Sequence, residues 1–90
     1  MKTIWKYELK LQAITTLELP TGARVVHVAE QEDRPQLWAL VDPSAPPEPR
    51  SFQTLATGEE FDDSKVEHVY LGSFLTHGGV FVGHVVELKF

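Results

Sequence analysis

The sequence predicts an all-β fold, a small single-domain antiparallel sandwich or barrel of six to seven short strands over residues 1–90. Apolar residues recur at every second position in several segments, turn-forming residues separate those segments, and no segment has a sustained helical period. Ninety residues provide one small core, which in other proteins is often supplemented by disulfides, metals or self-association. Because the chain has no cysteine, we expect self-association into a homo-oligomer.

Four strands are expected in the first half of the chain. The segment 3–11 alternates between an apolar face and a charged, solvated face, and the segment 15–19 is a short strand ended by the turn 20–22. The segments 23–30 and 36–42 are rich in β-branched and apolar residues. The polar turn between these two segments predicts an antiparallel hairpin.

Three further strands are expected in the second half. The segment 43–49 holds four of the six prolines, which predicts an exposed, extended loop because proline lacks a backbone donor. A strand follows over 50–57, and the acidic residues after it, 58–65, predict a turn-rich loop in which 62–65 start a single helical turn. The last two strands, 66–76 and 80–89, are joined by His77-Gly78-Gly79.

The expected core consists of apolar residues that share one face of each strand. These are Trp5, Tyr7, Leu9, Val26, Val28, Trp38, Leu40, Phe52, Leu71, Phe74, Val80, Val82 and Val86. Leu71 and Phe74 would point to opposite faces of a regular strand, so both face inward only if Gly72 marks a β-bulge. Both tryptophans lie in alternating apolar segments, which favours burial over an exposed platform.

No arrangement of residues in the sequence is typical of an enzyme. The four histidines are not spaced as metal ligands on a helix, and we expect separate imidazoles rather than a metal site. There is no nucleophile elbow, phosphate-binding loop, dinucleotide fingerprint or spaced carboxylate pair. The sequence therefore predicts a protein without catalytic activity, metal or cofactor.

Glycines and histidines gather in one apolar stretch near the end of the chain. Residues 71–86 hold four of the six glycines and two of the four histidines. The adjacent Gly78 and Gly79 permit positive φ angles and expose backbone amides that can bind an anion, and His77 beside them adds a donor. Glycine within a strand is unfavourable unless a close neighbour requires it, so Gly83 marks His84 as a further candidate contact. The simpler interpretation of His77-Gly78-Gly79 is a hairpin turn.

Few cations are available to recognise a phosphate or carboxylate. Arg24 and Arg50 are the candidate anion contacts because an arginine fork fits such groups, and both are otherwise expected to be solvated or paired. If the ligand carries a nucleotide base, that base would stack on the aromatic side chain of Trp5, Tyr7 or Trp38. Clustering of the cations with His77 would favour a small ligand, whereas dispersion would favour a protein partner.

The net charge and the hydropathy of the chain argue against a nucleic-acid-binding, secreted or membrane protein. The formal net charge is −5, with no basic stripe, which argues against general nucleic-acid binding. The first residues lack the apolar core of a signal peptide, and no apolar run approaches the roughly 20 residues of a membrane span. We expect no membrane association.

Four segments stand in this order over nearly the whole chain: MKTIWKYELK, LELPTGARVVHV, LWALVDP and LGSFLTHGGVFVGHV. In these segments the chain resembles a family of short, mostly uncharacterised proteins of bacteriophages and prophages. Related members often have threonine-glycine-histidine after the LWALVDP motif, where this chain has Thr57-Gly58-Glu59. A role for that histidine is therefore not transferred to this chain.

The resemblance implies a small accessory protein in the cytoplasm of a host bacterium. Proteins of this kind include oligomers that sequester nucleotide-derived defence signals without cleaving them. Our first hypothesis is accordingly a homo-oligomer that binds a small nucleotide-type ligand, with a pocket at a subunit interface. The alternatives are an inhibitor or adaptor that binds a host protein, and a structural, virion-associated module.

Overall fold

The chain folds into seven β-strands and one short 3₁₀ turn. The computed structural model describes residues 1–90. The strands are β1 (Thr3–Glu8), β2 (Ile14–Pro20), β3 (Arg24–Gln31), β4 (Arg34–Val41), β5 (Pro47–Ala56), β6 (Glu67–Thr76) and β7 (Phe81–Lys89), and the turn His77–Gly79 joins the last two. The predicted all-β fold class is confirmed.

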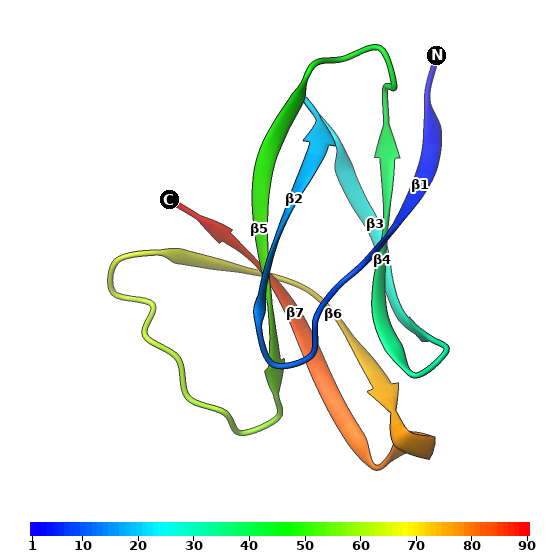
Figure 1. Ribbon diagram of the computed structural model, residues 1–90. Coiled ribbons are helices and arrows are strands. Elements are labelled where there is room, and N and C mark those ends of the chain that lie inside the picture. Colours follow the sequence, from blue (N-terminus) through cyan, green and yellow to red (C-terminus); the bar gives the residue numbers. More distant parts are fainter.

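The strands form two antiparallel sheets (Figure 1). The first has the order β1-β4-β3, and the second has the order β2-β5-β7-β6. The hairpins β3–β4 and β6–β7 are both present, as predicted. β3, an edge strand of the first sheet, lies beside β6, an edge strand of the second. Gly72 permits this approach, because a Cβ there would lie 3.1 Å from the Cβ of Val28.

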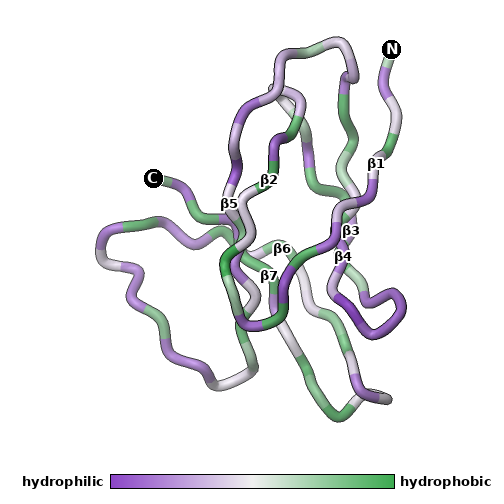
Figure 2. Tube along the Cα trace, in the orientation of Figure 1, coloured by the Kyte–Doolittle hydropathy of each residue, from purple (hydrophilic) through white to green (hydrophobic).

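The main core lies between the two sheets. Its ten buried residues are Leu9, Leu19, Ala23, Val28, Leu37, Ala39, Val41, Phe52, Phe74 and Val85. A second, smaller cluster of Leu55, Val86 and Leu88 lies on the outer face of the four-stranded sheet, because Val85 and Val86 are consecutive on β7 and point to opposite sides. Figure 2 shows hydrophilic residues at the turn between β3 and β4, away from both clusters.

The predicted core is confirmed in part. Leu9, Val28, Phe52, Phe74 and Val86 are buried, and Tyr7, Trp38, Leu40 and Leu71 are half-buried. The prediction is wrong for four residues, which are substantially exposed: Trp5, Val26, Val80 and Val82. Trp5 faces inward but lies on an edge strand, where it remains 41% exposed.

The other errors concern the phase of the alternation. β4 is apolar on both faces, and the structure buries Leu37, Ala39 and Val41 while Trp38 and Leu40 lie on the outer face. Val82 likewise lies on the outer face of β7, and Val80 belongs to the turn. When both faces of a strand are apolar, hydropathy does not show which side chains face the core.

Two β-bulges adjust which side chains reach the core. The pairing of β6 with β7 shifts between Tyr70 and Gly72, so that Leu71 is the extra residue and packs with Phe74 on the same core. The bulge that the sequence predicted at Gly72 is therefore confirmed. A second bulge leaves Val26 without a partner on β4, and Val25 takes its place against the core.

Two local predictions in the second half are wrong. β5 begins at Pro47, within the expected loop, and pairs with β2 through Pro47 and Pro49. These prolines are tolerated because β7 joins the other side of β5 only from Ser51 onward. Residues 62–65 form no helical turn, and bends lie at 64–66, with the Asp62 carboxylate accepting a hydrogen bond from the Ser64 amide.

Replacing Thr54 by valine is expected to lower the free energy of unfolding by about 1–3 kcal/mol. Thr54 is buried, and its hydroxyl donates to the Lys10 carbonyl at 2.6 Å and accepts from the Ala13 amide at 3.2 Å. Valine keeps the shape but leaves these groups of the β1–β2 connection without a partner. Urea titration of both proteins gives the difference; Thr54→Ser should stay close to wild type, and equal stability of the valine variant would contradict this role.

Candidate functional site

The nine residues that the sequence marked as candidate contacts lie in several separate places. His77, Gly78 and Gly79 form the tip of the β6–β7 hairpin, and His84 lies on the outer face of β7. Arg50 lies between the sheets, as do Trp5 and Tyr7 on β1. Arg24 and Trp38 share the outer face of the three-stranded sheet.

The His77-Gly78-Gly79 turn binds a carboxylate of the chain itself. All three residues have positive φ, from 54° to 88°, a conformation that suits the two glycines. The backbone amide of His77 donates to the Asp33 carboxylate at 2.6 Å, and the His77 ring lies 3.8 Å from the same group. Asp33 belongs to the turn of the β3–β4 hairpin, so this contact joins the two hairpin tips. No arginine or lysine is paired here.

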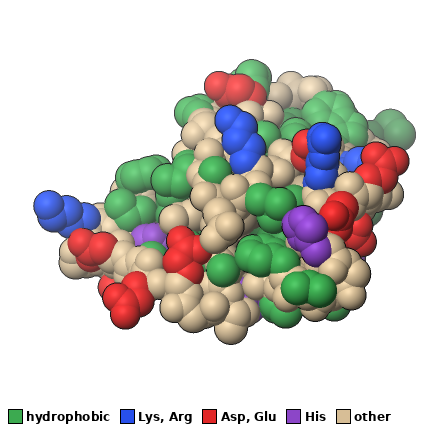
Figure 3. Space-filling model, turned by 60° about the horizontal axis from the view of Figure 1, so that its bottom comes forward, with side chains coloured by type: hydrophobic (Ala, Val, Ile, Leu, Met, Phe, Trp, Pro, Cys, Tyr) green, Lys and Arg blue, Asp and Glu red, His purple; other side chains and the backbone are tan.

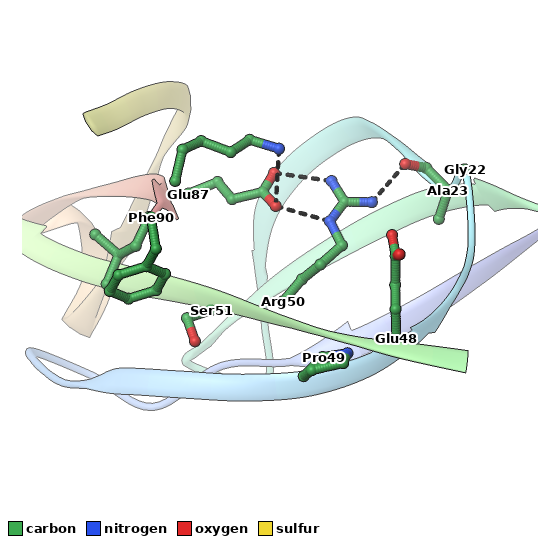
Figure 4. Close-up of a pocket in the computed structure, with 10 residues that line it drawn as sticks. Gly22, Ala23, Glu48, Pro49, Arg50, Ser51, Glu87 and Phe90 are labelled. Atoms are coloured by element: carbon green, nitrogen blue, oxygen red, sulfur yellow. Dashed lines mark hydrogen bonds and ion pairs between the residues drawn. The ribbon is translucent and has the colours of Figure 1, made fainter. Parts of the chain in front are cut away.

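Arg50 forms an internal ion pair with Glu87 (Figure 4). Its Nε and Nη2 atoms donate to the two carboxylate oxygens of Glu87 at 2.7 and 2.8 Å, and Nη1 donates to the Ala23 carbonyl. The two side chains are 15% and 5% exposed. Lys89 lies 3.4 Å from the same carboxylate. A cavity of about 600 Å³ opens beside this pair, but its charged lining is mixed and most of the Arg50 donors are occupied.

The ion pair changes the pKa of both partners. Burial raises the pKa of Glu87, but the hydrogen bonds and positive charge of Arg50, with Lys89, outweigh it and leave that pKa below its ordinary value. The hydrogen bond to Glu87 raises the pKa of Arg50. Both groups are therefore charged at neutral pH, and the pair is a structural contact of the interior.

A mixed basic and apolar surface covers the outer side of the three-stranded sheet. We call it the basic face, and it consists of two rows of cross-strand neighbours: Ile4, Leu40 and Arg24, and next to them Lys6, Trp38 and His27. The rings of Trp38 and His27 lie 5.4 Å apart at 49°. None of the four cavities is lined by Trp38, His27, Lys6 or Arg24, so this face is open.

The cations of the basic face have no acidic partner. Arg24 makes no ion pair or side-chain hydrogen bond, and Lys6 donates only to the neutral side chain of Gln31. Glu8, two residues after Lys6 on the same side of β1, forms an ion pair with Arg34 at 3.0 Å, so these two charges compensate each other. The basic face is therefore locally positive in a chain whose net charge is −5.

His84 lies in a small pocket on the outer side of the four-stranded sheet. We call it the His84 pocket; its volume is about 250 Å³, and its lining includes Leu55, Thr57, Phe61, Tyr70 and Val86. The two imidazole nitrogens are 2.6 Å from the Thr57 hydroxyl and 2.9 Å from the Tyr70 hydroxyl. These contacts fix the plane of the ring from two sides. Apolar walls with a few converging polar groups are typical of a small-molecule site.

Sequence reasoning missed several residues of these two surfaces. Lys6 and His27 join Trp38 only through the pairing of β4 with both β1 and β3. Thr57 and Tyr70 reach His84 across 27 and 14 residues of sequence.

The remaining features bear on metals and membranes. No group of three or more His, Cys, Asp or Glu side chains is placed to hold a metal ion. No helix has the length and apolar character that crossing a membrane requires.

Comparison with known proteins gives a family but no relative of described activity. A family model with the description "domain of unknown function (DUF7352)" matches residues 1–90. No curated protein and no solved structure matches significantly. Because the family model spans all ninety residues, the chain belongs to the DUF7352 family.

Proposed function

We propose that the chain is a non-enzymatic binding module whose basic face engages an acidic segment of another protein. The observation that supports this proposal is the pair of uncompensated cations, Arg24 and Lys6, placed around Trp38 on an open sheet face. Trp and Arg are enriched at protein interfaces, and a tryptophan at the centre of a contact often contributes much of the binding energy.

The arrangement favours a macromolecule over a small molecule. Ile4 is 56% exposed and Val26 is 44% exposed, so apolar side chains adjoin the cations without forming a cavity. A flat surface of this composition matches a partner that presents both carboxylates and apolar side chains. Neither Arg24 nor Arg50 contacts His77, and this dispersion of the cations also favours a protein partner.

A labelled peptide of alternating glutamate and leucine tests the proposal directly. We expect it to bind the wild-type chain in a fluorescence anisotropy titration, while a lysine-leucine peptide of equal length does not bind. Trp38→Ala should weaken binding at least about tenfold. Arg24→Glu and Lys6→Glu should weaken peptide binding more at low salt than at high salt, because salt screens interactions between exposed charges.

Lys65→Glu is the matched control, since Lys65 lies in the loop between β5 and β6 and forms no ion pair. It changes the net charge as much as Arg24→Glu does and should bind the acidic peptide nearly as well as wild type. An equal loss of peptide affinity in Arg24→Glu and Lys65→Glu would mean that only net charge matters. That result, or the absence of binding, would contradict the proposal.

A nucleotide-type ligand is the second candidate, supported by the same juxtaposition of Trp38 with Arg24. A base can stack on the indole while a phosphate meets the guanidinium. Because the face is open, such a ligand would be enclosed only between two copies of the chain. ADP-ribose and cyclic nucleotides should then raise the melting temperature and shift the chain to a dimer in size-exclusion chromatography. No thermal shift with any of them would exclude this candidate.

A further inference from the structure

We propose that the His84 pocket binds a small organic cation, such as a quaternary ammonium headgroup. The pocket lies on the outer side of the four-stranded sheet, whereas the basic face lies on the outer side of the three-stranded sheet. Nothing in this inference depends on the acidic partner proposed above. It rests on the aromatic groups of the pocket, its charge and its size.

Two aromatic side chains of the pocket have free surface. Phe61 is 47% exposed and Tyr70 is 59% exposed, although both contribute to the pocket lining. Each ring is held by a histidine: Phe61 lies 4.7 Å from the ring of His68, and Tyr70 lies 5.8 Å from the ring of His84. Aromatic faces attract cations through their quadrupole, and cages of such faces recognise quaternary ammonium groups.

The polar groups of the pocket are already paired with one another. The His84 imidazole contacts the hydroxyls of Thr57 and Tyr70, and the Thr57 amide donates to the Val82 carbonyl at 3.3 Å. A neutral imidazole has one donor and one acceptor, and the two hydroxyls can satisfy both. A ligand that needs no hydrogen bond therefore fits better than one that must displace these contacts. Quaternary ammonium ions have no N–H to donate.

The charge around the pocket favours a cation. Glu59 is the only acidic side chain among the lining residues, and no lysine or arginine lines the pocket. Glu60, Asp62 and Asp63 follow in the same loop, with Lys65 as its one basic residue, and Figure 3 shows both acidic and basic side chains at the left of the view, where this loop projects. The Ser64 hydroxyl and amide donate to Asp62 and lower the pKa of its carboxyl, so this charge persists at neutral pH.

The size of the pocket limits the ligand. A volume of about 250 Å³ lies below the roughly 300–1,000 Å³ of pockets that enclose drug-sized molecules. It suits a compact headgroup rather than a whole nucleotide. The acidic loop beside it also repels phosphate.

Three ligands with similar bulky heads and different charges test the inference. Choline is the cation, 3,3-dimethyl-1-butanol is its neutral counterpart, and 3,3-dimethylbutyrate is the anion. In NMR titrations that follow the ring resonances of Phe61, Tyr70 and His84, we expect choline to bind at least about threefold more tightly than the neutral alcohol. The carboxylate should bind least.

Variants separate the cation site from an ordinary apolar hollow. Phe61→Leu and Tyr70→Leu keep apolar bulk but remove an aromatic face, and both should abolish the preference for choline over the alcohol. Glu59→Gln should reduce that preference. Trp38→Leu, on the other sheet, is the control and should leave it unchanged.

Two results would overturn the inference. One is equal affinity for choline and the neutral alcohol, which would show an apolar pocket without charge selectivity. The other is the absence of resonance shifts with all three ligands in a chain that NMR shows to be folded. Neither result bears on the acidic peptide, so the failure of this site can be distinguished from the failure of the basic face.

Discussion

Replacing Glu87 by alanine is expected to lower the free energy of unfolding by about 3–5 kcal/mol. The carboxylate is 5% exposed and binds Arg50 through two hydrogen bonds. Without Glu87, the Arg50 guanidinium remains largely buried and has no carboxylate to which it can donate. Glu48 is the only other acidic residue that lines the cavity, and it forms no ion pair with Arg50. Such an uncompensated charge costs more than the pair itself contributes. Urea denaturation followed by tryptophan fluorescence measures the loss.

A double variant separates the ion pair from simple loss of packing. Arg50→Met with Glu87→Leu removes both charges and keeps apolar volume, so it should recover much of the stability lost in Glu87→Ala. If the double variant is as unstable as the single one, the loss arises from packing rather than from an unpaired charge. If Glu87→Ala is as stable as wild type, the pair has no structural role.

The same pair predicts a dependence of stability on pH. The pKa of Glu87 in the folded chain lies below its ordinary value of 4.5, so the unfolded chain binds the proton more readily. The stabilisation is therefore complete above about pH 5.5 and is lost as pH falls through 4.5 toward the folded pKa. The stability difference between wild type and Glu87→Gln should shrink over that range. A difference that grows toward acid pH would contradict the sign of this shift.

Replacing Gly83 by alanine is expected to lower the free energy of unfolding by about 2–3 kcal/mol. Gly83 is buried opposite Phe74 in the β6–β7 pair, and the phenyl ring lies over the glycine. A Cβ at this position would lie 2.7 Å from both Cε atoms of Phe74 and closer still to Cζ. Phe74 is 3% exposed in the main core, so displacing its ring would disturb the packing of the residues around it. Thermal and urea denaturation report the loss.

Two further variants test the cause of this effect. Phe74→Leu in the Gly83→Ala background shortens the side chain that clashes, so the two substitutions together should cost less than the sum of their separate effects. Gly72→Ala should be milder than Gly83→Ala, since its Cβ would lie 3.1 Å from Val28. Additive effects in the double variant would show that the loss does not come from this contact.

The local pattern of the sequence determined the strands and several of the turns. Alternation over 3–11 and the polar turn at 31–35 predicted β1 and the β3–β4 hairpin, because these features depend only on neighbouring residues. The opposite parity of Leu71 and Phe74 even located a bulge at Gly72. The all-β class follows from the same evidence. The short range of these rules also explains the error at Pro47, where strand pairing overrode the preference for a loop.

Only the tertiary structure decided which faces are buried and which residues meet. β4 is apolar on both sides, so the burial of Ala39 rather than Trp38 depends on how the second sheet packs against it. Arg50 meets Glu87 across 37 residues, and Thr57 meets His84 across 27. These contacts follow from the strand order β2-β5-β7-β6, which brings distant segments together. A period of two gives the spacing of side chains along a strand, whereas sheet order and packing determine what each side chain contacts.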